Sequence, residues 1–264
     1  MDLGLNGRTA LVTGASQGIG REIARALHRE GVSVALVAQD SGRLEAAERY
    51  VRGEARTRGN THVLAADLRL LGEVERVVAF SLERLGGVDF LIHSAARNTQ
   101  GGVSALSDEQ LDEAWQTKVR SCLRLVRALR QPMKERGGGH IIVITGATAR
   151  TPSADFLVGS MANAALVNFA RGASRELAHD NIHVNAISPG WTLTEGLLRR
   201  FEREANKLGV TVDDIIARET RTIPLRRFVT TQEIAALTLM ALSGTLPSLT
   251  GEEIILDGGA TPSI

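Results

Sequence analysis

A glycine-rich segment at residues 13–20 carries the clearest chemical signal, because its glycines follow the spacing Gly-x-x-x-Gly-x-Gly. An apolar, β-branched run precedes it and a helical pattern follows it. Glycines let the backbone approach a pyrophosphate without Cβ clashes, and the N-terminus of the following helix favours negative charge. Glycines also serve helix–strand packing, but the flanking strand and helix favour a dinucleotide site. The residues predicted to bind the cofactor there are Gly14, Ser16, Gln17, Gly18, Ile19 and Gly20.

His93 is a candidate acid–base group at the end of another apolar run. Ligands bind outside the carboxyl ends of parallel strands, and histidine titrates near neutral pH. A lone histidine at such a position also occurs as a hydrogen-bonded structural residue, so both interpretations stay open.

Seven short apolar runs alternate with longer amphipathic patterns. The runs lack polar–apolar alternation, as expected of strands buried on both faces. Strand, crossover helix and strand repeated in this way predict a Rossmann-type, doubly wound α/β fold of about seven parallel strands with helices on both faces. We expect a single domain over residues 1–264. The predicted strands are 9–13, 32–38, 61–66, 88–93, 140–145, 182–188 and 253–256, and the main predicted helices are 20–30, 73–85, 108–136 and 162–179.

Residues 194–227 interrupt this rhythm with a polar stretch rich in arginine and glutamate. The stretch is either a lid over a cleft or a loosely packed surface excursion. Its Arg199, Arg200 and Arg203 could bind an acidic substrate, although such a cluster is more commonly a solvated helix face.

Composition excludes several classes of function. The 264 residues include 31 basic and 30 acidic side chains and only 3% aromatics, which argues against nucleic-acid binding. The single cysteine, Cys122, leaves no internal disulfide and is consistent with a reducing compartment. We find neither a signal peptide nor a membrane-spanning run, and we assign no metal ligands. These features predict a cytoplasmic protein.

Four further motifs accompany the glycine-rich segment, and together they resemble the short-chain dehydrogenase/reductase family over essentially the whole chain. The order and spacing of these motifs argue against a chance resemblance. The motifs are Ala66-Asp67-Leu68, Asn185-Ala186-Ile187-Ser188-Pro189-Gly190-Trp191-Thr192-Leu193-Thr194, Ile223-Pro224-Leu225-Arg226-Arg227-Phe228 and Thr250-Gly251-Glu252-Glu253-Ile254-Ile255-Leu256-Asp257-Gly258-Gly259.

The resemblance implies how a nicotinamide dinucleotide lies. It places Asp67 beside the adenine, Pro189 and Gly190 along the nicotinamide, and Thr194 near the carboxamide. The alternative for Asp67 is a helix N-cap. The same resemblance adds further cofactor contacts: Gln39, Leu68, Ser94, Ala95 and Thr192.

The choice between NAD and NADP depends on the end of the second strand, where a carboxylate binds a free ribose and a cation binds a 2′-phosphate. The usual acid position is Ala38 and the usual arginine position is Gln39. Gln17 is also neutral, whereas Asp40 is either a turn residue or a ribose ligand. Because no cation is visible, the sequence favours NAD.

The family's usual catalytic tyrosine, lysine, serine and asparagine are all replaced here. Gly159 stands at the tyrosine position, Asn163 at the lysine position, Gly146 at the serine position and Lys118 at the asparagine position. The only tyrosine, Tyr50, lies on the adenosine side of such a fold. The two glycines lead us to expect a roomier pocket.

A lysine at the asparagine position and an asparagine at the lysine position look like an exchange of two side chains between two facing helices. We hypothesise that Lys118 projects its ammonium group into the pocket near Asn163 and acts as proton donor or oxyanion stabiliser. The alternative is a solvated helix residue. His93 is the second candidate, whereas Thr145 and Ser160 are interpreted as strand-end and helix-start residues.

Three functions remain open: an NAD(P)-dependent oxidoreductase with a non-standard proton donor, a lyase, hydrolase or isomerase on the same fold, and a catalytically inactive dinucleotide-binding protein. The complete cofactor motifs favour the first. We expect a small-molecule carbonyl or hydroxyl substrate. The resemblance also implies a homotetramer or homodimer.

Overall fold

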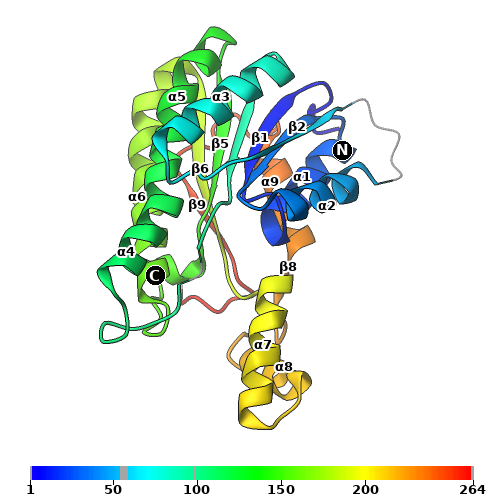
Figure 1. Ribbon diagram of the computed structural model, residues 1–264. Helices are drawn as coiled ribbons and strands as arrows, with labels where there is room; N and C mark the ends of the chain where they lie inside the picture. Colours follow the sequence, from blue (N-terminus) through cyan, green and yellow to red (C-terminus); the bar gives the residue numbers. More distant parts are fainter. Residues whose placement is uncertain (1, 54–58, 98, 263–264) are drawn as a thin grey trace.

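The computed structural model describes residues 2–53, 59–97 and 99–262. Its centre is a seven-stranded sheet in the order β3-β2-β1-β4-β5-β6-β9, with every neighbouring pair parallel (Figure 1). This confirms the predicted Rossmann-type α/β fold. The strands are β1 (Thr9–Thr13), β2 (Ser33–Ala38), β3 (Thr61–Ala65), β4 (Phe90–His93), β5 (Gly139–Ile144), β6 (Ile182–Pro189) and β9 (Glu253–Leu256).

Helices cover both faces of the sheet, because the strands are apolar on both sides. One face packs into a buried cluster with α3, α5 and α6, and the other into a second cluster with α1, α2 and α9 (Figure 1). The helices of the main body are α1 (Gly18–Arg29), α2 (Ser41–Arg52), α3 (Leu71–Leu85), α4 (Asp108–Trp115), α5 (Ser121–Glu135), α6 (Leu157–Leu177) and α9 (Thr231–Leu242).

The helix predicted over residues 108–136 is interrupted in its middle. A π-helical turn, Gln116–Arg120, joins α4 to α5. Single π turns inside helices commonly occur at functional sites, because the extra residue rotates the side chains that follow. Lys118 lies on this turn.

The strand order reverses between β1 and β4, since the chain builds outward from β1 to β3 and then crosses to the other side. Ligands of open α/β sheets bind in the crevice outside the carboxyl ends at such a switch point. The glycine-rich segment and His93 both lie at this point.

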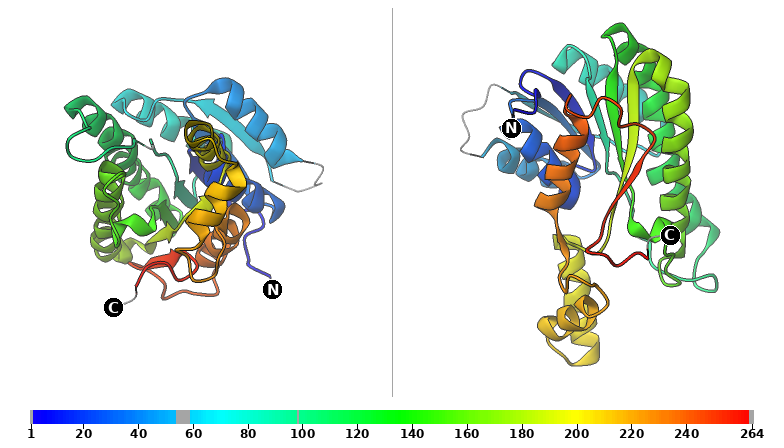
Figure 2. Two further views of the ribbon diagram at one scale, coloured as in Figure 1. Left: turned by 90° about the horizontal axis from the view of Figure 1, so that it is seen from below. Right: turned by 180° about the vertical axis from the view of Figure 1, so that it is seen from behind.

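Residues 194–227 form a helical projection at the carboxyl end of the sheet, visible in Figures 1 and 2. The projection contains α7 (Glu195–Leu208) and α8 (Val212–Thr220), and the parallel pair β7 (Thr192–Leu193) and β8 (Val229–Thr230) forms its base. Phe201, Ile215 and Phe228 are among the residues of its own small core. The segment is therefore packed rather than loose.

Within the described ranges, no helix combines the length and apolar character needed to cross a bilayer.

Candidate functional site

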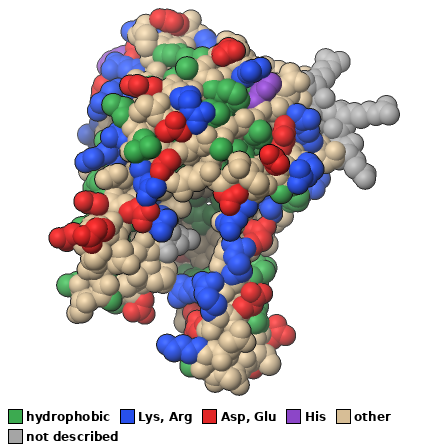
Figure 3. All heavy atoms as spheres, in the orientation of Figure 1, with side chains coloured by type: hydrophobic (Ala, Val, Ile, Leu, Met, Phe, Trp, Pro, Cys, Tyr) green, Lys and Arg blue, Asp and Glu red, His purple; other side chains and the backbone are tan. Residues whose placement is uncertain are grey.

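A cleft of about 380 Å³ lies at the carboxyl ends of β1, β2, β4 and β5. Figure 3 shows the surface hollowed between the α7–α8 projection and the main body. The glycine-rich segment forms one wall, and the first turn of α7 forms another. The cleft is lined by Gly14, Ser16, Gln17, Gly18, Ile19, Ala38, Gln39, Asp40, Arg43, Ala66, Asp67, Leu68, Ser94, Ala95, Ala96, Thr117, Lys118, Ile144, Thr145, Thr194, Glu195 and Gly196.

Most of the residues predicted to contact a dinucleotide thus meet in one cavity, but four do not line it. Gly20 lies inside α1, where an added Cβ would come within 2.5 Å of the Gly14 carbonyl oxygen. Pro189 ends β6, Gly190 follows that strand, and Thr192 donates a hydrogen bond of 2.9 Å to the Gly190 carbonyl.

The glycine-rich segment fits an anionic ligand. Gly14 has φ +66°, and a Cβ there would lie 2.6 Å from the Ser94 carbonyl oxygen, so a larger residue would disturb the junction of β1 and β4. At the start of α1, the N-cap residue Gln17 makes no side-chain capping hydrogen bond. The first backbone N–H groups of a helix have no partner within the helix and therefore favour a phosphate.

Asp67 lines the cleft just beyond the carboxyl end of β3. Its carboxylate accepts hydrogen bonds from the Arg69 guanidinium, including one of 2.6 Å. The same guanidinium also donates a hydrogen bond to the Glu113 carboxylate on α4. The Arg69 contact is the main cause that holds the pKa of Asp67 below its ordinary value, and Gln39 contributes. The N-cap of α3 is Leu70, so Asp67 is not that helix's cap.

Arg43, which lines the cleft together with Asp40, is a residue that the sequence analysis missed. Asp40 caps α2 by accepting a hydrogen bond of 2.9 Å from the Arg43 backbone N–H. The Arg43 guanidinium lies 3.5 Å from the Asp40 carboxylate and is 61% exposed. It lines the cleft, and it escaped notice because it lies past the usual arginine position, on the first turn of α2. A capping Asp followed three residues later by Arg is the signal that could have identified it.

Lys118 enters the cleft wall from the π turn. Only 8% of the residue is exposed, so it is not a solvated helix residue. Its Nζ donates a hydrogen bond to Oδ1 of Asn163 on α6, and Nδ2 of Asn163 donates one of 2.8 Å to Thr148. Burial lowers the pKa of Lys118 to about 8. The structure therefore brings Lys118 and Asn163 into contact, as the sequence analysis predicted.

His93 lies outside the cleft lining and is fully buried. Its Nδ1 lies 3.0 Å from the Thr13 hydroxyl, and its Nε2 donates to the Lys118 carbonyl at 2.9 Å. Burial lowers the pKa of His93 to about 4, which keeps the ring neutral. This geometry favours the structural interpretation over the catalytic one: His93 holds the backbone of the π turn.

The expectation of a roomier pocket at the two glycines is wrong. A Cβ at Gly159 would overlap the ring of Phe156, and one at Gly146 would lie 2.7 Å from Nδ2 of Asn163. Neighbouring side chains therefore occupy the space that a tyrosine and a serine would need. Neither glycine lines the cleft.

Two hydroxyl groups near these positions are held by other polar atoms. Thr145 lies 2.6 Å from the Ser188 hydroxyl, which donates to Glu253 at 2.7 Å. Ser160 donates to the Phe156 carbonyl at 2.8 Å. Neither hydroxyl contacts a base, which agrees with their interpretation as structural groups.

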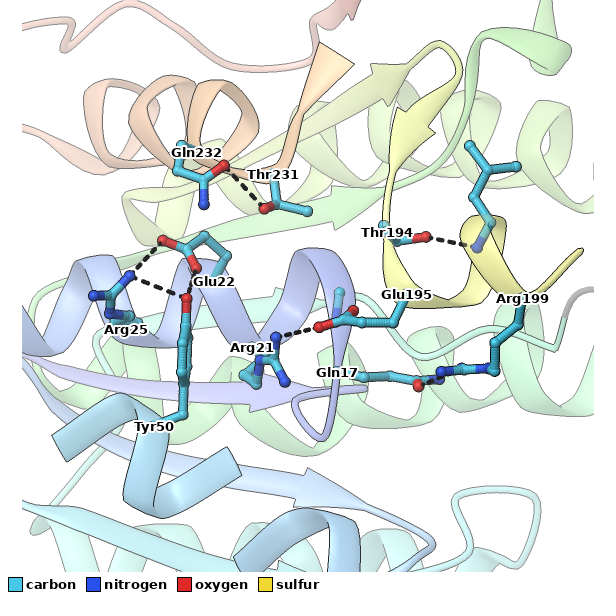
Figure 4. A network of polar contacts seen from close by, with 12 residues as sticks. Gln17, Arg21, Glu22, Arg25, Tyr50, Thr194, Glu195, Arg199, Thr231 and Gln232 are labelled. Carbon is cyan, nitrogen blue, oxygen red and sulfur yellow. Dashed lines mark hydrogen bonds and ion pairs between the residues drawn. The ribbon is translucent and has the colours of Figure 1, made fainter. Parts of the chain in front are cut away.

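The first turn of α7 is tied directly to the glycine-rich segment (Figure 4). Glu195 accepts a hydrogen bond of 3.2 Å from the Gly18 backbone N–H and forms an ion pair with Arg21. Arg199 donates to the Gln17 side chain at 2.9 Å. Burial alone would raise the pKa of Glu195, but its hydrogen bonds and Arg21 hold that pKa below its ordinary value. Sequence analysis did not identify Glu195, because this contact joins residues 177 positions apart.

No group of three or more His, Cys, Asp or Glu side chains within the described ranges is arranged to hold a metal ion.

Comparison with known proteins gives similarity along the whole chain. Residues 14–261 match the family model described as Enoyl-(Acyl carrier protein) reductase. The 2,3-dihydro-2,3-dihydroxybenzoate dehydrogenase of Bacillus subtilis (strain 168) is 28% identical over 258 residues, which cover 98% of this chain and 97% of that protein.

Solved structures agree with this match. The L-sorbose reductase of Gluconobacter frateurii, crystallised with NADPH and L-sorbose, has a TM-score of 0.96 at 28% identity over 100% of both chains. A structure described as a short chain dehydrogenase/reductase family protein has a TM-score of 0.84 at 29% identity, over 99% of this chain and 100% of that one.

Proposed function

The chain belongs to the short-chain dehydrogenase/reductase family, and from this premise we propose that it is an NAD(P)-dependent oxidoreductase acting on a small carbonyl or hydroxyl compound. The observation that carries the proposal is the start of α1, which receives no side-chain cap from its own N-cap residue Gln17 and faces a cleft that Gly14, Asp67 and Thr194 also line. A solved relative that was crystallised with NADPH and L-sorbose supports the same class of reaction.

The chain's own residues suit a dinucleotide. The backbone N–H groups at the start of α1 would hold the pyrophosphate, Asp67 and Gln39 the adenosine, and Thr194 the nicotinamide end. When bound, the nicotinamide supplies or accepts the hydride. The sequence favoured NAD because it showed no cation, but Arg43 lines the cleft and supplies one. We therefore propose that Arg43 binds the 2′-phosphate of NADP(H).

Lys118 is the proposed proton donor in place of the family's tyrosine. Lys118 lines the cleft, and its amine donates a hydrogen bond to Asn163 and has its pKa lowered to about 8 by burial. A general acid works best when its pKa lies near the operating pH. As the carbonyl carbon gains hydride, the Lys118 ammonium would give its proton to the carbonyl oxygen. In the oxidative direction the neutral amine would accept the hydroxyl proton. Asn163, oriented by Thr148, would fix the direction of Nζ.

A second candidate is a catalytically inactive dinucleotide-binding protein. The filled positions at Gly146 and Gly159 favour it, because they leave no room for the family's usual groups. A lyase, hydrolase or isomerase that uses Lys118 without net hydride transfer is the remaining alternative. Incubation with NADPH and a panel of ketoses and keto acids separates these functions. Consumption of NADPH supports the oxidoreductase, substrate loss without NADPH consumption supports the non-redox enzyme, and neither change supports the binding protein.

We also propose that residues 194–227 act as a lid. Glu195 and Gly196 line the cleft, while the rest of α7 and α8 packs into a separate small core that could move as a unit. A homodimer or homotetramer remains a proposal that sedimentation analysis would test.

A further inference from the structure

The start of α1 lacks an anionic partner of its own. Gln17 provides no capping hydrogen bond, and the first turn of α1 contains no acidic residue. Helix N-terminal N–H groups favour an anion, because the helix dipole adds to their unpaired hydrogens. Glu195 meets this need from α7, a helix that begins far along the chain.

Glu195 makes two contacts that a phosphate group would also make. One carboxylate oxygen accepts from the Gly18 N–H at 3.2 Å, and the other pairs with the Arg21 guanidinium. Figure 4 shows the Glu195 side chain reaching from α7 toward α1. A carboxylate and a phosphate both accept charge-assisted hydrogen bonds, so one can take the place of the other.

Arg21 is held on the main body rather than on the projection. Its guanidinium lies 4.4 Å above the Tyr50 ring, and Tyr50 donates a hydrogen bond of 2.7 Å to Glu22 (Figure 4). Arg21 therefore stays with α1 and α2 if α7 moves. Glu195, which is 41% exposed and stands at the first position of α7, is the partner that can leave.

We propose that Glu195 is a carboxylate stand-in for the dinucleotide's pyrophosphate, so that it sets cofactor affinity by competing for the Gly18 N–H and Arg21. The inference rests on the proposed function. Binding of the dinucleotide displaces the Glu195 carboxylate from the Gly18 N–H and from Arg21. The measured affinity for the dinucleotide therefore equals the intrinsic affinity multiplied by the fraction of molecules in which Glu195 does not occupy the site.

The test compares E195A and E195Q with the wild type and with E202A. Glu202 is a matched control, because it is an exposed glutamate on the same helix. Titration calorimetry with NADPH and with NADH gives the dissociation constants. We expect E195A to bind both roughly 3- to 10-fold more tightly than wild type, E195Q to lie between them, and E202A to match wild type.

A second measurement does not depend on the cofactor. Hydrogen exchange of the ligand-free proteins should show a faster Gly18 amide in E195A than in wild type or E202A, because its acceptor is gone. Equal or weaker dinucleotide binding by E195A, or an unchanged Gly18 exchange rate, would overturn this inference alone. Absence of dinucleotide binding by wild type and every variant would overturn the proposed function and this inference with it.

Discussion

The Nζ atom of Lys118 donates a hydrogen bond to Oδ1 of Asn163, which links the π turn after α4 to the N-terminal half of α6. Both residues are buried, and Thr148 holds the other side of the Asn163 amide. An amide partner leaves the charge of the lysine uncompensated, so burial lowers its pKa.

Replacing Lys118 should abolish proton donation while leaving dinucleotide binding in place. We expect K118M to lower kcat for carbonyl reduction by roughly 100- to 10,000-fold, the usual effect of removing a general acid. K207M removes an exposed lysine of α7 and serves as the control. Steady-state kinetics and NADPH titration together check this prediction. Unchanged kcat in K118M would remove Lys118 from the mechanism.

The pH dependence follows from the lowered pKa of Lys118, about 8. The ammonium form donates the proton, so carbonyl reduction should be fast below this pH and decline as the pH rises through it. The reverse oxidation needs the neutral amine and should rise over the same range. Rates measured in both directions across pH 6 to 10 at saturating cofactor check the opposite signs. Parallel profiles would contradict them.

Arg43 should discriminate between the two dinucleotides. Loss of one exposed cation facing a phosphate should weaken NADPH binding roughly 10-fold and leave NADH binding unchanged. R43Q is the variant, and R49Q, which removes an exposed arginine of the same helix, is the control. Calorimetric titrations give all the affinities. Equal losses for NADPH and NADH in R43Q would instead point to a general structural effect.

His93 and His140 should make the fold sensitive to acid. Burial lowers the pKa of each to about 4 from the ordinary 6.5, and His183 adds to the effect at His140. The unfolded chain therefore takes up protons before the folded chain does. The free energy of unfolding should be fully present above pH 6.5 and decrease as the pH falls toward 4.

Urea unfolding near pH 7 and near pH 5 measures this loss. H93Q removes one titrating group, so its difference in unfolding free energy between the two pH values should be smaller than that of wild type. The same difference in both proteins would show that His93 does not contribute to the acid sensitivity.

The fold and part of the site could be predicted because their signals are local or periodic. Apolar runs without alternation predicted the parallel strands, and the glycine spacing placed the turn before α1. The pairing of Lys118 with Asn163 was predicted from the family resemblance, which implies that each stands at a position where another catalytic residue is usual.

The remaining features depend on tertiary packing that leaves no local pattern. The Phe156 ring fills the space beside Gly159, and Glu195 crosses from α7 to Gly18. Such contacts join segments whose separate sequences carry no sign of each other. Arg43 was missed for a different reason, since the guanidinium reaches the cleft from the first turn of α2 rather than from the end of β2.

The most direct measurement for the account as a whole is calorimetric titration of the wild-type protein with NADPH and with NADH. We predict saturable binding of one dinucleotide per chain, suppressed by prior addition of the other. No binding heat and no competition with either nucleotide, at any concentration up to the solubility limit, would contradict the assignment of the cleft.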